Sequence, residues 1–145
     1  RMMAGIRGKD TKPEILIRQG LHRKGYRFRL HRAGLPGRPD LVFPSRQSVI
    51  MVHGCFWHGH DCHLFKWPSS RQEFWHGKIT RNQQKDGESE NALLRKGWRV
   101  LTVWECALKG RTRQPLEWVI DQCAAWLETS TERAEITGND KAATR

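Results

Sequence analysis

Apolar residues recur along this chain first at helical and then at strand spacing. The segment Thr11-Lys12-Pro13-Glu14 has the pattern of a helix start, with a hydroxyl cap, an early proline and an acidic residue three positions after the cap. Ile17 and Leu21 follow at helical spacing, and Gly25 is suited to end the helix. Period-two alternation then predicts a strand with one basic face over residues 26–30, and apolar runs predict strands over 40–43 and 49–52.

The second half of the chain contains longer elements. Its composition predicts a helix over residues 70–96 that breaks near Asp86-Gly87, and then an apolar strand over 98–104. A last helix over 114–127 has one apolar face, made of Leu116, Val119, Ile120, Cys123, Trp126 and Leu127. This order predicts an α/β fold with a mixed central sheet flanked by helices, in a single domain over residues 1–128, followed by a polar, flexible tail over 129–145.

Length and charge narrow the classes of protein. The chain has 145 residues, enough for about one domain, and it contains no apolar run near the roughly 20 residues of a membrane span. Its first residues lack the apolar segment of a secretion signal. The net charge is +11, and residues 1–39 hold eleven Lys and Arg against two acidic residues. Residues 1–10 are interpreted as a basic arm, and such one-sided charge favours a polyanionic partner, with a solvated helix face as the alternative.

Cysteine and histidine are concentrated between His53 and His63. These eleven residues hold two of the four cysteines and four of the seven histidines, which favours a metal site over a disulfide framework. The predicted ligands of a structural Zn²⁺ are Cys55, His60, Cys62 and Cys106. Cys106 is preferred as the fourth ligand because it follows a strand end, whereas Cys123 lies on an apolar helix face. Unliganded thiols are the alternative.

A second kind of chemistry is indicated by Asp40. This residue begins a strand directly after Gly37-Arg38-Pro39, and the neighbouring strand ends at Val52-His53. A carboxylate where two strands meet can hold Mg²⁺ against a phosphodiester, and the ion can orient the attacking water. His53, His58 and His63 are left over from the zinc site, and imidazole can act as an acid or base near neutral pH. Each of these residues is, taken alone, equally compatible with a turn or a polar loop.

Five motifs in combination resemble one known family. They are Leu35-Pro36-Gly37-Arg38-Pro39-Asp40, His53-Gly54-Cys55-Phe56-Trp57-His58, Glu73-Phe74-Trp75, Gly97-Trp98-Arg99-Val100-Leu101 and Val103-Trp104-Glu105-Cys106-Ala107-Leu108. From about Met3 to Leu127 the chain resembles the very-short-patch (Vsr) mismatch repair endonucleases. The second motif is highly specific for this family, whereas the first motif alone is only modestly specific.

The resemblance implies a restriction-endonuclease-like α/β fold with a structural Zn²⁺ and a catalytic Mg²⁺. It implies nicking of one DNA strand on the 5′ side of the thymine in a T·G mismatch, the product of 5-methylcytosine deamination. The residues that match catalytic positions are Asp40, His53, His58, Glu14 and Asp86. Asp40 matches the metal-binding carboxylate, His58 the base that activates water, and His53 an imidazole near the scissile phosphate.

The second protein ligand to Mg²⁺ in the family is a main-chain carbonyl, which falls here on Val52. Many relatives carry threonine at this position. Because the main chain is the ligand, valine removes a hydroxyl without removing the ligand. The four cysteine and histidine ligands predicted from spacing also match the zinc ligands of the family.

Aromatic residues match a wedge that the family inserts into DNA. Phe56, Trp57 and Trp75 match rings that enter the duplex beside the mismatch, where unstacking costs least, and Met3 matches a residue on the minor-groove side. Core packing is the alternative for the two tryptophans. The family implies a monomer that acts on mismatched double-stranded DNA in the bacterial cytoplasm, at the nucleoid, with mismatch-repair accessory proteins as candidate further partners and no membrane association.

Two other functions stay open at this point. One is a nicking nuclease of the same fold that acts on another lesion or sequence. The other is a non-catalytic, zinc-stabilised DNA-binding module, for which binding would fall steeply with salt and no metal-dependent cleavage would occur.

Overall fold

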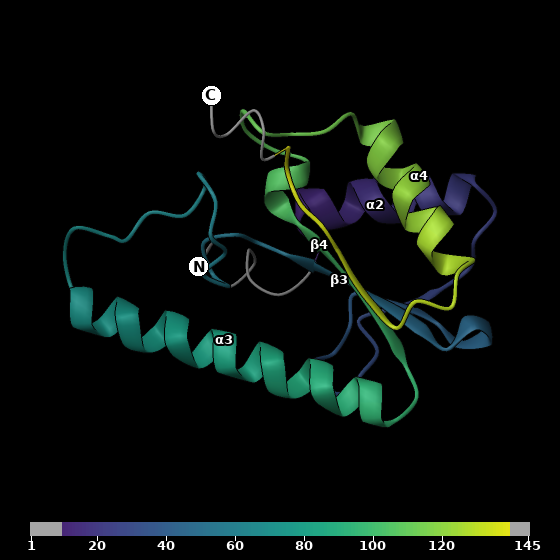
Figure 1. The fold of residues 1–145 in the computed structure, drawn as a ribbon, viewed down its shortest axis with the longest axis horizontal. Helices are drawn as coiled ribbons and strands as arrows, with labels where there is room; N and C mark the ends of the chain where they lie inside the picture. Colours follow the sequence, from purple (N-terminus) through teal and green to yellow (C-terminus); the bar gives the residue numbers. More distant parts are fainter. Residues whose placement is uncertain (1–9, 140–145) are drawn as a thin grey trace.

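A five-stranded mixed sheet organises the structure, a computed structural model that describes residues 10–139 (Figure 1). The strands are β1 (Arg29–Leu30), β2 (Leu41–Phe43), β3 (Ser48–His53), β4 (Arg99–Trp104) and β5 (Arg133–Ile136), and they lie in that order. β1, β2 and β3 pair antiparallel, whereas β3, β4 and β5 pair parallel. Two short 3-10 helices follow β2 and β4, at Pro44–Arg46 and Glu105–Ala107. The predicted mixed α/β class is therefore confirmed.

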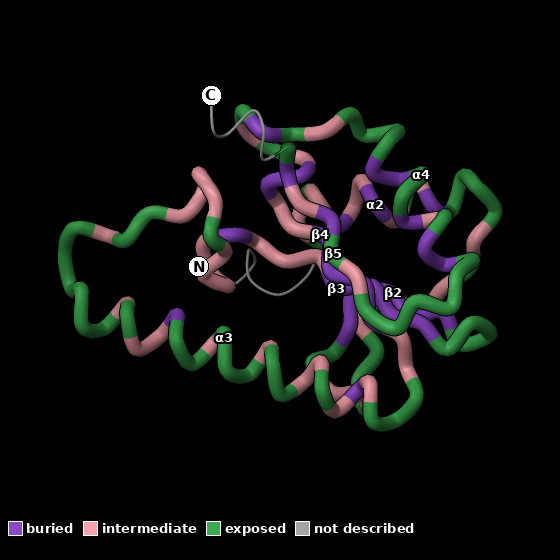
Figure 2. Tube along the Cα trace, viewed as in Figure 1, coloured by how far each residue is buried: buried purple, intermediate pink, exposed green. Residues whose placement is uncertain are grey.

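Helices α2 (Lys12–Arg23) and α4 (Leu116–Leu127) cover one face of the sheet (Figure 1). The hydroxyl of Thr11 caps α2 by accepting a hydrogen bond from the Glu14 N–H at 3.4 Å, as predicted. The two helices and this face of the sheet form the larger apolar core, which Figure 2 shows as buried: Ile17, Leu21, Leu41, Phe43, Ile50, Leu101, Val103, Val119, Ile120, Cys123, Trp126 and Leu127 are among its members.

Helix α3 (Gln72–Arg95) covers the opposite face and is continuous. The predicted break near Asp86-Gly87 is wrong, because one glycine costs a helix only about 1 kcal/mol and α3 is anchored by buried Ile79 and Leu93 on either side. Leu93 packs with residues of β2, β3 and β4 in a second, smaller core. Trp75, Ile79, Asp86 and Leu93 recur at helical spacing and therefore share one face of α3. Leu93 turns this face toward the sheet, whereas Trp75 turns it toward Phe56 and Trp57 in the loop after β3.

The segment after residue 128 returns to the sheet. β5 pairs with β4 from Val100↔Arg133 to Val103↔Ile136, so the prediction of a flexible tail is wrong for these residues. The guanidinium of Arg99 supports the return by donating hydrogen bonds to the carbonyls of Trp126, Leu127 and Thr131 at 3.0–3.2 Å. As an edge strand β5 is paired on one side only, which lets it be polar.

The first predicted strand is shorter than its sequence pattern. Only Arg29–Leu30 pair with β2, whereas Tyr26 and Phe28 place their rings against Phe43 in the larger core. Met3 and residues 1–9 of the predicted basic arm lie outside the described residues. Among residues 10–139, no helix has both the length and the apolar character to cross a bilayer.

Candidate active site and metal centre

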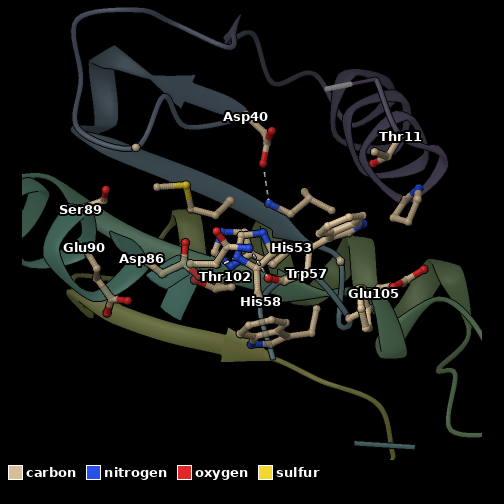
Figure 3. A pocket seen from close by; sticks show the side chains of 18 of the residues that line it. Thr11, Asp40, His53, Trp57, His58, Asp86, Ser89, Glu90, Thr102 and Glu105 are labelled. Carbon is tan, nitrogen blue, oxygen red and sulfur yellow. Dashed lines mark hydrogen bonds and ion pairs between the residues drawn. The ribbon is translucent and has the colours of Figure 1, made fainter. Parts of the chain in front are cut away.

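A cleft of about 820 Å³ opens between α3, the start of α2 and the ends of β2, β3 and β4 (Figure 3). All five residues predicted to be catalytic line it: Glu14, Asp40, His53, His58 and Asp86. The predicted wedge residues Phe56, Trp57 and Trp75 line it as well. His63 does not, because its ring is hydrogen-bonded to the Thr112 hydroxyl at 3.0 Å outside the cleft.

Asp40 lies immediately before β2, and its carboxylate points across to the end of β3 (Figure 3). Its Oδ2 accepts a hydrogen bond from the Val52 N–H at 2.7 Å. The residue is only 9% exposed, and burial raises the pKa of its carboxyl group to about 7, against the lowering effect of the Val52 N–H. Without a cation, this position therefore disfavours the carboxylate form.

Glu14 is a second buried carboxylate, at the first turn of α2 and 1% exposed. Its oxygens accept hydrogen bonds from the Asp10 N–H at 2.9 Å and from Arg18 at 3.1 Å, and His31 Nε2 lies 2.5 Å away. His31 Nε2 also lies 3.9 Å from Asp40 Oδ1, so this ring stands between two carboxylates. No motif marked His31, because its position depends on a left-handed backbone (φ 44°) after β1.

The imidazoles of His53 and His58 stack in parallel, with ring centroids 3.8 Å apart and an interplanar angle of 3°. His58 Nδ1–H donates to Asp86 Oδ2 at 2.6 Å, which leaves Nε2 as the lone-pair nitrogen. His53 Nδ1 is buried and has no hydrogen-bond partner among the described residues. Burial, followed by the nearby His58, lowers the pKa of His53 to about 3, so this ring is neutral near pH 7. The arrangement offers one oriented base beside one neutral imidazole.

The four predicted zinc ligands converge on one point. The ligand atoms of Cys55, His60, Cys62 and Cys106 all lie within 4.8 Å of one another, and His60 Nδ1 is 3.6 Å from the sulfur atoms of both Cys55 and Cys106. Zn–S bonds of about 2.3 Å and Zn–N bonds of about 2.0 Å in a tetrahedron separate nitrogen from sulfur by about 3.5 Å. Hydrogen bonding between the two thiols lowers the pKa of Cys106 to about 4 and raises that of Cys55. Two sulfur atoms and an imidazole at these separations, with a third sulfur near by, fit Zn²⁺.

Three contacts that sequence patterns did not indicate support this centre. The indole of Trp104 stacks on His60 with centroids 4.1 Å apart, and the Gly138 N–H donates to Cys106 Sγ at 3.3 Å. Glu105 Oε1 accepts from the N–H of Cys55 at 3.0 Å. Gly138 acts through its main chain and therefore leaves no side-chain signal, whereas Trp104 and Glu105 precede Cys106 directly in the sequence.

The aromatic residues predicted to contact DNA form a cluster that lines the cleft. Phe56 lies 5.2 Å from Trp57 and 5.3 Å from Trp75 between ring centroids, and the two tryptophans are 5.8 Å apart. All three are partly exposed, and none belongs to either apolar core. Asn82 Nδ2 donates to the Trp57 carbonyl at 2.8 Å and ties the loop to α3.

The fold and the site define a class of protein: an α/β protein whose cleft is lined by carboxylates and imidazoles, beside a cluster of cysteine and histidine residues that could hold a metal ion. The family profile described as DNA mismatch endonuclease Vsr matches residues 1–64. The type II nicking enzyme V.XorIIP of Xanthomonas oryzae pv. oryzae is 50% identical over 122 residues, 80% of this chain and 90% of that protein. The DNA mismatch endonuclease Vsr of Escherichia coli K12 is 44% identical over 134 residues, 92% of this chain and 86% of that protein.

A third relative, the type II nicking enzyme V.NmeAIP of Neisseria meningitidis, is 41% identical over 110 residues, 76% of this chain and 79% of that protein. The chain therefore belongs to the Vsr family of DNA mismatch endonucleases. It is a nuclease that nicks DNA, and the predicted family and enzyme class are confirmed.

Proposed function

We propose that this nuclease nicks one strand of duplex DNA on the 5′ side of the thymine in a T·G mismatch, in a Mg²⁺-dependent hydrolysis. The observation that carries the proposal is one cleft lined by a buried carboxylate, an imidazole oriented by a second carboxylate, and a cluster of three aromatic rings. The relative from Escherichia coli is named a DNA mismatch endonuclease, which favours a mismatch as the target.

Asp40 and the Val52 carbonyl are the proposed Mg²⁺ ligands. In a strand, the N–H and C=O of one residue face the same neighbour, so the Val52 carbonyl faces the side on which Asp40 already contacts the Val52 N–H. Mg²⁺ prefers such oxygen ligands, and a bound cation would stabilise the carboxylate that burial alone disfavours. When bound, Mg²⁺ neutralises charge on the phosphate. His31 contacts both Glu14 and Asp40, so Glu14 and His31 together position the Asp40 carboxylate.

His58 is the proposed general base. Asp86 holds Nδ1–H, so Nε2 can accept a proton from the water that attacks the phosphorus. His53 stays neutral, keeps the His58 ring in place by stacking, and lies beside the phosphate.

Zn²⁺ has a structural role in this proposal. Cys55, His60, Cys62 and Cys106 would fill all four positions, which leaves none for a substrate. The ion then fixes the loop that carries both Phe56 and His58. Phe56, Trp57 and Trp75 are proposed to insert beside the mispair. The fold is proposed to be restriction-endonuclease-like, and the enzyme to act as a monomer at the nucleoid in bacterial cytoplasm.

The test is a nicking assay on T·G and T·A duplexes of the same sequence, with and without Mg²⁺. We expect Mg²⁺-dependent nicking of the T·G duplex only, abolished in Asp40→Ala and retained in Asp121→Ala, whose carboxylate pairs with Lys24 at the surface. Equal cutting of both duplexes would refute mismatch specificity. Normal turnover by Asp40→Ala would refute the metal assignment.

A second candidate is nicking at another mispair or sequence, which the names of the type II nicking enzymes among the relatives favour. A panel of all mispairs in several flanking sequences separates the two. The non-catalytic alternative finds no support among these relatives.

A further inference from the structure

An exposed aromatic stack joins the loop between β3 and α3 to the first turns of α3. Trp67 is 43% exposed, and its ring stacks on that of exposed His76 with centroids 3.8 Å apart and an interplanar angle of 15°. Phe65 meets Trp67 edge to face at 4.8 Å. We name the pair of Trp67 and His76 the aromatic platform; neither residue belongs to an apolar core, so core packing does not explain it.

The platform is continuous with the aromatic cluster of the cleft. Phe65 stacks on Phe56 with centroids 5.7 Å apart, so an unbroken series of rings runs from the proposed wedge to Trp67. Successive bases of one strand rise by about 3.4 Å, and the two ring-to-ring steps therefore place Trp67 within about three nucleotides of Phe56.

The segment of the chain that carries the platform is rich in basic residues. Residues 64–81 contain four basic side chains, Lys66, Arg71, Lys78 and Arg81, against one acidic residue, Glu73. Within residues 10–139, none of the four takes part in an ion pair. The Arg71 guanidinium instead lies over the ring of exposed Phe74, 4.3 Å from its centroid. Exposed rings together with cationic side chains are the combination with which proteins hold unpaired nucleotides, because rings stack on bases and cations contact phosphates.

We propose that the aromatic platform is a second nucleobase-binding site, which receives one base that the wedge releases from the duplex. The proposal rests on the proposed wedge. Inserted rings unstack neighbouring base pairs, and a base freed in this way lies within reach of a ring face that can replace part of its lost stacking. The platform thereby stabilises the opened duplex on the side of Phe56 on which Phe65 and Trp67 lie.

The first experiment locates the released base. T·G duplexes carry 5-iodouracil at one position at a time, up to four nucleotides on either side of the mispaired thymine, and are irradiated with the zinc-loaded protein without Mg²⁺. We expect cross-links to Trp67 or His76, identified by mass spectrometry, from a position within three nucleotides of the mispair. Cross-links to the wedge residues with none to the platform at any position would overturn the proposal.

The second experiment measures affinity. We expect Trp67→Ala to weaken binding of the T·G duplex about tenfold, and Trp67→Phe to restore most of it, because the gain comes from ring stacking. Trp118→Ala is the matched control, since Trp118 is 42% exposed but lies on α4, over the other face of the sheet. Equal effects of Trp67→Ala and Trp118→Ala would refute a specific site, and thermal melting verifies that each variant is folded.

A duplex with one bulged base separates this proposal from the proposed function. The bulge offers a free base without any mismatch, so Trp67→Ala should weaken its binding even if wild-type protein fails to distinguish T·G from T·A. If wild-type protein fails to prefer T·G over T·A while Trp67→Ala still weakens binding of the bulged duplex, the result contradicts only the proposed function. No platform effect on either duplex contradicts the platform.

Discussion

Replacing Asp40 by asparagine tests the central feature of the cleft, a buried carboxylate proposed to bind a cation. Asparagine has nearly the same shape, and its side-chain oxygen can keep the hydrogen bond from the Val52 N–H. What the substitution removes is the titrating proton and the negative charge. The comparison of the two proteins therefore isolates the free energy of ionising this one group.

The size of the effect follows from the pKa of Asp40, which rises from 3.8 in the unfolded chain to about 7 in the folded protein, mainly through burial. A raised pKa means that the protonated form favours folding. This contribution to the free energy of unfolding is complete below pH 3.8 and is lost as pH rises through 7. The shift corresponds to about 4 kcal/mol in total, of which about 3 kcal/mol falls between pH 5 and pH 8.

The assay is urea unfolding of wild-type and Asp40→Asn protein at pH 5 and pH 8 in Mg²⁺-free buffer. The free energy of unfolding of the asparagine variant should rise by about 3 kcal/mol relative to that of wild type on going from pH 5 to pH 8. Adding Mg²⁺ at pH 8 should stabilise wild type and leave the variant unchanged. If the difference in the free energy of unfolding between the two proteins does not change with pH, the raised pKa of Asp40 is refuted. Equal stabilisation of both proteins by Mg²⁺ would refute the role of Asp40 as a ligand.

Further substitutions test the other parts of the site. Asp86→Asn should lower the rate of nicking by roughly 10²- to 10⁴-fold with DNA affinity unchanged, because an amide that can also donate replaces the carboxylate that fixes the tautomer of His58. Single-turnover kinetics and a binding assay check both. Gly138→Ala should weaken Co²⁺ or Zn²⁺ binding at least tenfold, because an added Cβ would lie 2.3 Å from Thr112 Oγ1 and 2.7 Å from the Cys106 carbonyl; an unchanged Co²⁺ absorption titration would contradict this. Removal of zinc by a chelator should abolish nicking, and readdition of zinc should restore it. Nicking that survives complete loss of zinc would show that the loop keeps its structure without the ion.

Local patterns predicted those elements in which side chains determine the structure. The start of α2 followed from Thr11 and its spacing to Glu14, and β3 and β4 followed from their apolar runs. β5 was not predicted because its sequence is polar and lacks a strand pattern. It forms a strand through its pairing with β4, which is not visible in the local sequence. The predicted break in α3 assigned too much weight to Gly87, whose position has open space around it in a helix held by packing elsewhere.

The candidate site divides in the same way. The clustering of the candidate ligands and imidazoles could be predicted because all but Cys106 lie in one short motif, and Cys106 follows directly after a strand. His31 and Gly138 could not, since a left-handed backbone aligns the first and a main-chain N–H carries the contact of the second. Neither property leaves a periodicity or a spacing in the sequence.

The continuity of α3 sets the position of the cut in the proposed mechanism. Trp75 and Asp86 lie eleven residues apart on this helix, which is about three turns and about 16 Å along its axis, on nearly the same face. The helix thus fixes the distance between the inserted ring of Trp75 and the Asp86 carboxylate, which orients His58. Deleting one residue between them would swing the two groups apart by about 100°, so a homologue that cuts at a different offset from its wedge would have to change α3 by whole turns.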